Sequence, residues 1–311
     1  MSDADLRKSI LATIAYYDVM DYPLTGFEVW KYLTRIQGGL TGISHKYSLV
    51  EVLKEADGDS LKRLIEERQG FYFLKGRQQL AEQRLEKNKI ANCKLRKLLK
   101  VVKWLRCVPF VRMIAVTGSL GMKNTDPKSD LDLLIVLKHG RIFTGRLLVT
   151  LATHVLGQRR HGEKIANRVC LNYFVTDESL SISLKDIFSA SEYSFMLPVF
   201  GWHKFQKFQK ANGWIADYKP DFQPDTIYNS KFLYDTFFSR TVRGFGENLL
   251  NFSFLEQELK RRQLLKIESN PKTHQPQSLI IANDEMLVFL PEPQGPMIFE
   301  KFKYGLEKIS R

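Results

Sequence analysis

The sequence predicts an α+β fold, with a mixed-sheet core between an N-terminal region of short helices and a mostly helical C-terminal half. Three observations carry this prediction. Apolar runs with the length and composition of buried strands occur at 111–116, 131–137 and 169–175. A helical pattern at 142–156 separates the second run from the third, which is typical of an α/β or α+β core rather than a bundle. Beyond residue 184, most segments favour helix, and the stretch at 278–290 is strand-like.

Residues 1–76 are predicted to form a winged-helix-like domain. A helical apolar pattern opens this region, at Leu6, Ile10, Ile14 and Tyr17. Further helical stretches follow, and a short β run bounded by glycines ends the region at 70–76. Helices followed by a β-wing are the order of a winged helix. Because its second and third helices mix acidic with basic residues, docking to a protein or another domain is favoured over reading DNA.

A long basic helix is predicted to connect this region to the core, over residues 77–108. Its apolar stripe alternates spacings of four and three residues, at Ala91, Leu95, Leu98, Val102 and Leu105. Pro109 ends the helix. The core is then expected over 109–182, and a mostly helical C-terminal domain over 183–311.

The net charge of +13 is concentrated in two zones. Residues 76–107 carry a net charge of +8 and residues 141–168 a net charge of +5, so the rest of the chain is neutral. Two local basic zones indicate a polyanionic ligand, either a nucleic acid or a phosphate-rich molecule such as a nucleoside triphosphate. The alternative is a solvated basic helix face, which is the commoner outcome for a run of charges.

Composition excludes several classes of protein. Hydrophobic residues make up 44% of the chain, enough for a packed core, which excludes a disordered protein. Three cysteines are too few and too scattered for a disulfide framework or a zinc site, so a reducing compartment, the cytoplasm, is expected. The most apolar run, at 147–156, is too short to span a bilayer, so no membrane partner is expected.

The segment that joins the first two predicted strands carries the chemical signal. Gly118 and Ser119 follow the first strand, where a glycine lets backbone amides approach an anion. A polar loop of ten residues leads to Asp130 and Asp132 at the head of the second strand. Alternation places both carboxylates on one face, about 6–7 Å apart along the strand. Because such charges repel, we expect a divalent cation, magnesium or manganese. The alternative is an acidic turn that Ser129 caps locally.

This segment resembles the nucleotidyltransferase superfamily typified by DNA polymerase beta, with its minimal-nucleotidyltransferase and aminoglycoside-nucleotidyltransferase relatives. Gly118, Ser119, Asp130 and Asp132 match the pattern, and the resemblance extends to about residue 177. The whole arrangement is also similar to uncharacterised bacterial nucleotidyltransferase-domain proteins. The resemblance implies a metal-dependent enzyme that moves a nucleoside monophosphate from a nucleoside triphosphate to a hydroxyl acceptor and releases pyrophosphate.

The third carboxylate that the family pattern places on a later strand is missing. Asn172 occupies mid-strand, where it can ligate a metal through its carbonyl oxygen but cannot act as a base. Asp177 and Glu178 lie just past this strand and are candidates to replace it. A non-catalytic nucleotide-binding regulator or adaptor with a degenerate core is therefore the alternative to an active enzyme.

A basic segment follows the predicted helix at 142–156. Its residues Arg159, Arg160 and Lys164 are candidates to flank the cleft and neutralise a triphosphate. A basic helix terminus and a solvated loop explain them equally well. The sequence leaves the acceptor open among a small molecule, an RNA end and a protein, with weak nucleic-acid binding through the basic zones as one expectation.

Overall fold

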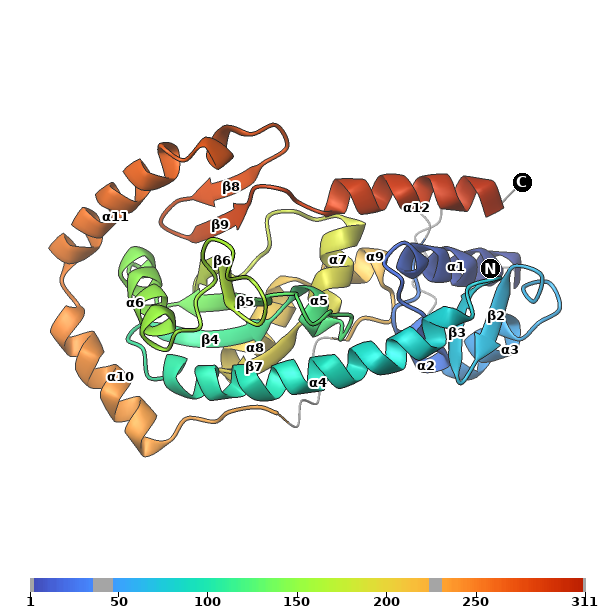
Figure 1. Cartoon of the computed structure of the whole chain (residues 1–311), viewed down its shortest axis with the longest axis horizontal. Helices are drawn as coiled ribbons and strands as arrows, with labels where there is room; N and C mark the ends of the chain where they lie inside the picture. The colour runs from blue at the N-terminus through green and yellow to red at the C-terminus, as the bar shows by residue number, and fades with distance from the viewer. Residues whose placement is uncertain (1–2, 36–46, 224–230, 310–311) are drawn as a thin grey trace.

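The computed structural model describes residues 3–35, 47–223 and 231–309. A six-stranded sheet in the order β7-β4-β5-β6-β9-β8 forms its centre (Figure 1). The strands are β4 (Val111–Val116), β5 (Leu131–Leu137), β6 (Val169–Thr176), β7 (Leu197–Phe200), β8 (Leu279–Ala282) and β9 (Met286–Leu290). Only β5 and β6 pair in parallel, and the other neighbours are antiparallel. The predicted mixed sheet is therefore present.

Helices cover both faces of this sheet. On one face, the apolar stripe of α4 (Gln79–Leu105) and the buried side of α6 (Ile142–Val155) pack on the odd-numbered residues of β5. On the other face, three shorter helices pack on the even-numbered residues of the same strand: α7 (Ile187–Ser194), α8 (Trp202–Ala211) and α9 (Ile215–Tyr218). Because Asp130 and Asp132 are even-numbered, they share the face that α7 covers.

The central sheet extends beyond the segment predicted as the core. β7, β8 and β9 come from residues after 182, so the C-terminal half supplies strands as well as helices. Its remaining elements are α10 (Phe237–Leu250), α11 (Ser253–Glu268), a 3₁₀ turn η1 (Pro271–His274) and α12 (Gly295–Ile309). The domain borders drawn from the sequence stay predictions.

The N-terminal region has its own small sheet, and its core also includes Met122, Phe195 and residues of α12. Its elements are α1 (Asp3–Asp18), β1 (Leu24–Thr25), α2 (Gly26–Lys31), α3 (Leu49–Ala56), β2 (Ile65–Arg68) and β3 (Phe71–Leu74). The three strands pair antiparallel in the order β1-β3-β2. α12 returns from the far end of the chain to pack on α1, as Figure 1 shows. The winged-helix assignment of this region stays a prediction.

Helix α10 is amphipathic, but unlike α4 it turns its polar side toward the protein and its apolar side toward solvent. Its polar side faces the body of the protein, where Glu247 accepts two hydrogen bonds from Arg112 and Arg243 pairs with Asp235. Its outward side exposes large apolar side chains at Phe237, Phe238, Phe245 and Leu249. Among the described residues, no helix combines the length and the apolar character needed to cross a membrane.

Candidate active site

The turn after β4 brings the backbone against the head of β5. Gly118 opens the short helix α5 (Gly118–Gly121) with a φ of +60°, a conformation that favours glycine. A Cβ atom at this position would lie 2.7 Å from Oδ2 of Asp132. The neighbouring Thr117 N–H donates to the backbone oxygen of Asp132, at 3.1 Å. Glycine therefore permits a contact between this turn and the Asp132 carboxylate that no other residue allows.

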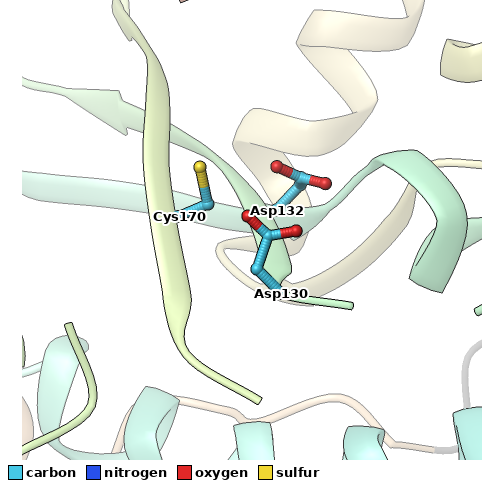
Figure 2. Close-up of side chains that lie close together, drawn as sticks. All are labelled: Asp130, Asp132 and Cys170. Atoms are coloured by element: carbon cyan, nitrogen blue, oxygen red, sulfur yellow. The ribbon is translucent and has the colours of Figure 1, made fainter. Parts of the chain in front are cut away.

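The two carboxylates of β5 lie close together, as alternation along the strand predicted. Asp130 and Asp132 each offer an oxygen that lies within 4.8 Å of the other and of the Sγ atom of Cys170 (Figure 2). Burial and the charge of Asp130 raise the pKa of Asp132 to about 6. The surroundings of Asp132 therefore stabilise its negative charge poorly. This donor set fits a divalent cation held mainly by carboxylate oxygens.

Arg160 is the sequence-predicted basic residue that reaches these carboxylates. Its Nη1 atom donates to Oδ2 of Asp130 at 2.5 Å and to Sγ of Cys170 at 3.5 Å. Arg159 and Lys164 are exposed in the segment between α6 and β6. Ser119 is half-buried in α5, and its backbone oxygen accepts a hydrogen bond from Asn124. Whether these last three side chains hold a nucleotide stays a prediction.

Asn172 lies on the same side of the sheet as the two aspartates. Its Nδ2 atom donates to Oδ1 of Asp132 at 3.1 Å. The register of the parallel pair shifts between Asp132/Cys170 and Leu134/Tyr173, so β6 has one more residue than β5 at this point. Such an irregularity is a β-bulge, and bulges re-aim side chains at functional sites. The amide is therefore positioned as the sequence predicted, and its role stays a proposal.

Cys170 is a member of the cluster that the sequence reasoning missed. It pairs with Asp132 across the parallel strands and lies two residues before Asn172. The period of two along a strand was the available signal, because it places residues 170 and 172 on one face. Burial and the nearby aspartates raise the pKa of the Cys170 thiol to about 12, so the sulfur keeps its proton. A protonated thiol is a poor ligand for a hard cation such as magnesium.

Asp177 and Glu178 lie at the opposite end of β6 from the cluster. The strand rises about 3.3 Å per residue, so Asp177 is about 16 Å along the chain from Asn172. Asp177 accepts hydrogen bonds from Lys204 at 2.6 Å and from the backbone N–H of His139 at 2.9 Å, and these bonds hold its pKa below the usual value. Glu178 is 3.5 Å from His139. The structure therefore does not bring either residue to Asp130 and Asp132.

Glu192 supplies a further carboxylate near the cluster, from helix α7. Burial and then the charge of Asp132 raise the pKa of Glu192 to about 7, and the backbone N–H of Gly118 opposes that rise. Glu192 is thus coupled to both halves of the motif predicted from the sequence. No pattern in the sequence indicated this residue, because it lies about 60 positions after Asp132 in a segment whose packing only the fold reveals.

Comparison with known proteins gives one match. Residues 95–243 match the family model described as "Nucleotidyltransferase domain". This region begins within α4 and ends within α10, and it contains the carboxylates of β5, the polar residues of β6 and helix α7. No curated protein and no solved structure matches the chain significantly.

Proposed function

Because the chain belongs to the nucleotidyltransferase superfamily through residues 95–243, we propose that it transfers a nucleoside monophosphate from a nucleoside triphosphate to a hydroxyl group. The acceptor oxygen forms a bond to the α-phosphorus, the bond from that phosphorus to the β-phosphate oxygen breaks, and pyrophosphate leaves. The acceptor hydroxyl gives up its proton in the same reaction. The observation that carries this proposal is the pair Asp130 and Asp132 facing the Gly118 turn.

Asp130 and Asp132 are the residues that would hold magnesium or manganese. The raised pKa of Asp132, which burial and the charge of Asp130 cause, supports the assignment. The carbonyl oxygen of Asn172 is a neutral ligand within reach of the same carboxylates. When bound, the cation supplies positive charge that neutralises the triphosphate.

The basic and glycine-rich parts of the site are assigned to the phosphates. We assign the Gly118 turn to the phosphates and name the backbone N–H of Ser119 as the donor, because the N–H of Gly118 already donates to Glu192. Arg160, beside Asp130, is placed to pair with a phosphate, and the exposed Arg159 and Lys164 extend this positive region. We assign the third carboxylate to Glu192 rather than to a residue of β6, because Asn172 cannot accept the acceptor's proton.

Incubation of the purified protein with each of the four triphosphates and Mg²⁺ or Mn²⁺ tests this function. Label in the α-phosphate is expected to move to an acceptor from a fractionated extract, with one pyrophosphate released per transfer. The matched control is the variant that carries Asp130→Asn and Asp132→Asn. Release of orthophosphate without transfer of the α-label would contradict the proposal. The family match does not favour the non-catalytic alternative, which predicts metal-dependent triphosphate binding with no transfer at all.

A further inference from the structure

A hollow of about 290 Å³ lies between the C-terminal part of α4 and the end of α6. Its lining is basic and aromatic, with Lys97, Lys100, Val101, Trp104, Leu156 and Gln158. Trp104 is 55% exposed, which is unusual for a residue of that size. The hollow is therefore a surface feature that combines positive charge with an accessible aromatic face.

One side of this hollow continues along α4 to the candidate active site. Lys94, Lys97, Val101 and Trp104 follow the spacing of one helix face. The Nζ atom of Lys94 donates to the backbone oxygen of Ser129 at 2.6 Å, directly before Asp130. Ten residues separate Lys94 from Trp104, which corresponds to about 15 Å along the helix. Lys94 is itself buried, so the exposed positive charge of the hollow comes from Lys97 and Lys100, and Lys94 ties the helix to the residue before the first carboxylate.

The other side of the hollow is connected to Asp130 through the chain segment 158–160. Gln158 lines the hollow, and Arg159 and Arg160 follow it directly in the chain. The guanidinium of Arg160 then contacts Asp130 at 2.5 Å. The two basic zones recognised in the sequence therefore both border this hollow, and each also contacts the head of β5, through Lys94 on Ser129 and Arg160 on Asp130.

The positive charge of this hollow has few carboxylates to compensate it. No acidic residue occurs between Lys87 and Arg106, and Glu163 is the only one in residues 141–168. In the parts of the chain that the structure describes, the ion pairs of the first zone involve Arg77, Glu82 and Arg84, all near the N-terminus of α4. The lysines from Lys87 to Lys103 thus have no ion-pair partner among the described residues.

We propose that the hydroxyl acceptor is the end of a single-stranded polynucleotide, bound in the groove between α4 and residues 156–160. Uncompensated lysines attract successive phosphates, and an exposed indole stacks on a base. About 15 Å corresponds to about four nucleotides at the duplex rise of 3.4 Å per nucleotide. This inference rests on the proposed function, because it is the terminal hydroxyl of the strand that would receive the nucleoside monophosphate.

Fluorescence anisotropy with a 5′-labelled 12-nucleotide RNA, and with DNA of the same sequence, tests this groove. The first variant carries Lys97→Glu and Lys100→Glu, and its matched control carries Lys303→Glu and Lys308→Glu on the exposed side of α12. We expect the first variant to bind at least about tenfold more weakly at low salt, with a salt slope smaller by about 1.4. The control loses the same charge and should differ much less from the wild type.

A second variant, Trp104→Leu, tests stacking separately from charge. It keeps an apolar side chain, so we expect folding to be retained while affinity for the strand falls about 5- to 100-fold. If the lysine variant does not fold, this variant and the salt slope of the wild type still decide the outcome. Stronger binding to RNA than to DNA, or the reverse, identifies which strand the groove accepts.

Several results would overturn the inference. Binding of the wild type that does not weaken with salt, or equal losses in the groove variants and the α12 control, would exclude the groove. Binding to anionic vesicles without binding to either strand would assign the surface to lipid. Calorimetric titration with Mg²⁺ and a triphosphate, run on the same samples, separates the two proposals. If the wild type binds the triphosphate but no polynucleotide, only the proposed acceptor is rejected. If the wild type does not bind the triphosphate, the proposed function is rejected.

Discussion

Strands β5 and β6 run side by side and in parallel, yet they contribute opposite chemistry to the same point. β5 presents two carboxylates, Asp130 and Asp132, and β6 presents a thiol and an amide, Cys170 and Asn172. Each strand orients its pair by the same period of two. The strands therefore differ in charge, and β6 also differs in local geometry through its β-bulge.

This difference shows how the cluster stabilises its negative charge in the absence of a cation. Asp132 already has its pKa raised to about 6, by burial first and by Asp130 second. A third carboxylate directly opposite would raise it further. Asn172 instead donates a hydrogen bond to Asp132 at 3.1 Å, which stabilises the ionised form. The amide of β6 thus lowers the cost of the charge on β5, and a further buried carboxylate, Glu192, comes from a helix.

The largest expected effect comes from making β5 as neutral as β6. The double change Asp130→Asn and Asp132→Asn removes both charges with little change in volume. We expect metal-dependent triphosphate binding to disappear and nucleotidyl transfer to fall by about 10²- to 10³-fold or more. Circular dichroism should stay that of the wild type. Unchanged magnesium-dependent binding, measured by calorimetry, would show that the metal assignment is wrong.

The next largest effect is expected from a substitution that disturbs the close approach of the Gly118 turn to β5. Gly118→Ala places a Cβ atom 2.7 Å from Oδ2 of Asp132, at a φ of +60°. The matched control is Gly140→Ala, which has a φ of +70° but nothing within 4 Å of the added atom. We expect both variants to lose about 1 kcal/mol of unfolding free energy from backbone strain.

Only the Gly118 variant should also lose triphosphate binding, by about tenfold or more, because its new atom displaces a carboxylate and blocks backbone amides. Triphosphate binding should weaken more than monophosphate binding. Calorimetric titration with both nucleotides checks this expectation. Equal losses in the Gly118 and Gly140 variants would mean that strain alone is responsible and that the turn does not hold the terminal phosphates.

A charge added to β6 makes the two strands alike. Asn172→Asp replaces the hydrogen bond to Asp132 with a repulsion, so the metal-free protein should lose about 1–3 kcal/mol of unfolding free energy. The same change adds a ligand, so we expect affinity for Mn²⁺ to rise about tenfold. Thermal unfolding with and without Mn²⁺ measures both effects. A variant that is destabilised to the same extent with the ion present would show that Asn172 does not face the cation.

Most of β5 and β4 could be predicted from the sequence, because their signals are local. Apolar runs at 111–116 and 131–137 coincide with the strands, and alternation gave the shared face of Asp130 and Asp132. Asn172 was named as the polar mid-strand residue at the third acidic position of the family pattern, and it donates to Asp132. The helix predicted over 77–108 is α4, whose observed bounds are slightly shorter. These features depend on residues only a few positions apart, so a single sequence contains them.

What the sequence did not reveal depends on pairing between distant segments. The β-bulge opposite Leu133 and the contact of Cys170 with the aspartates follow from the register of β5 against β6. The stretch predicted as strand-like at 278–290 forms β8 and β9, but the sequence showed neither its pairing with β6 nor the strand β7 at the other edge of the sheet. Glu192 reaches the site because α7 covers that face of the sheet. No local periodicity encodes these long-range relations.

The smallest predicted effect is a difference in titration between Asp132 of β5 and Cys170 of β6. Because magnesium binds the ionised carboxylate, its apparent affinity should fall up to tenfold per pH unit as the pH drops below about 6, the pKa of Asp132. The thiol of Cys170, with a pKa of about 12, should add no inflection between pH 7 and 9. Cys170→Ser should therefore leave the pH profile of magnesium-dependent triphosphate binding unchanged. A second inflection that this variant abolishes would make the thiolate a ligand.

Asp132 also allows a test of protein stability in the absence of metal, in which the expected pH dependence has the opposite sign to that of magnesium binding. The folded protein raises the pKa of Asp132 from the ordinary value of 3.8 to about 6, so it holds this proton more tightly than the unfolded chain does. The contribution of Asp132 to the unfolding free energy is therefore complete below pH 4 and is lost as the pH rises through about 6.

Asp132→Asn should then be more stable than the wild type at pH 7.5 by about 1–2 kcal/mol, a value reduced for partial solvent access. Saturating Mg²⁺ should remove or reverse this advantage, since only the wild type gains binding energy from the ion. Urea unfolding at pH 4.5 and 7.5, with and without Mg²⁺, measures all four values. An Asp132→Asn variant that is less stable than the metal-free wild type at pH 7.5 would show that the carboxylate is a structural group and not a site held ready for a cation.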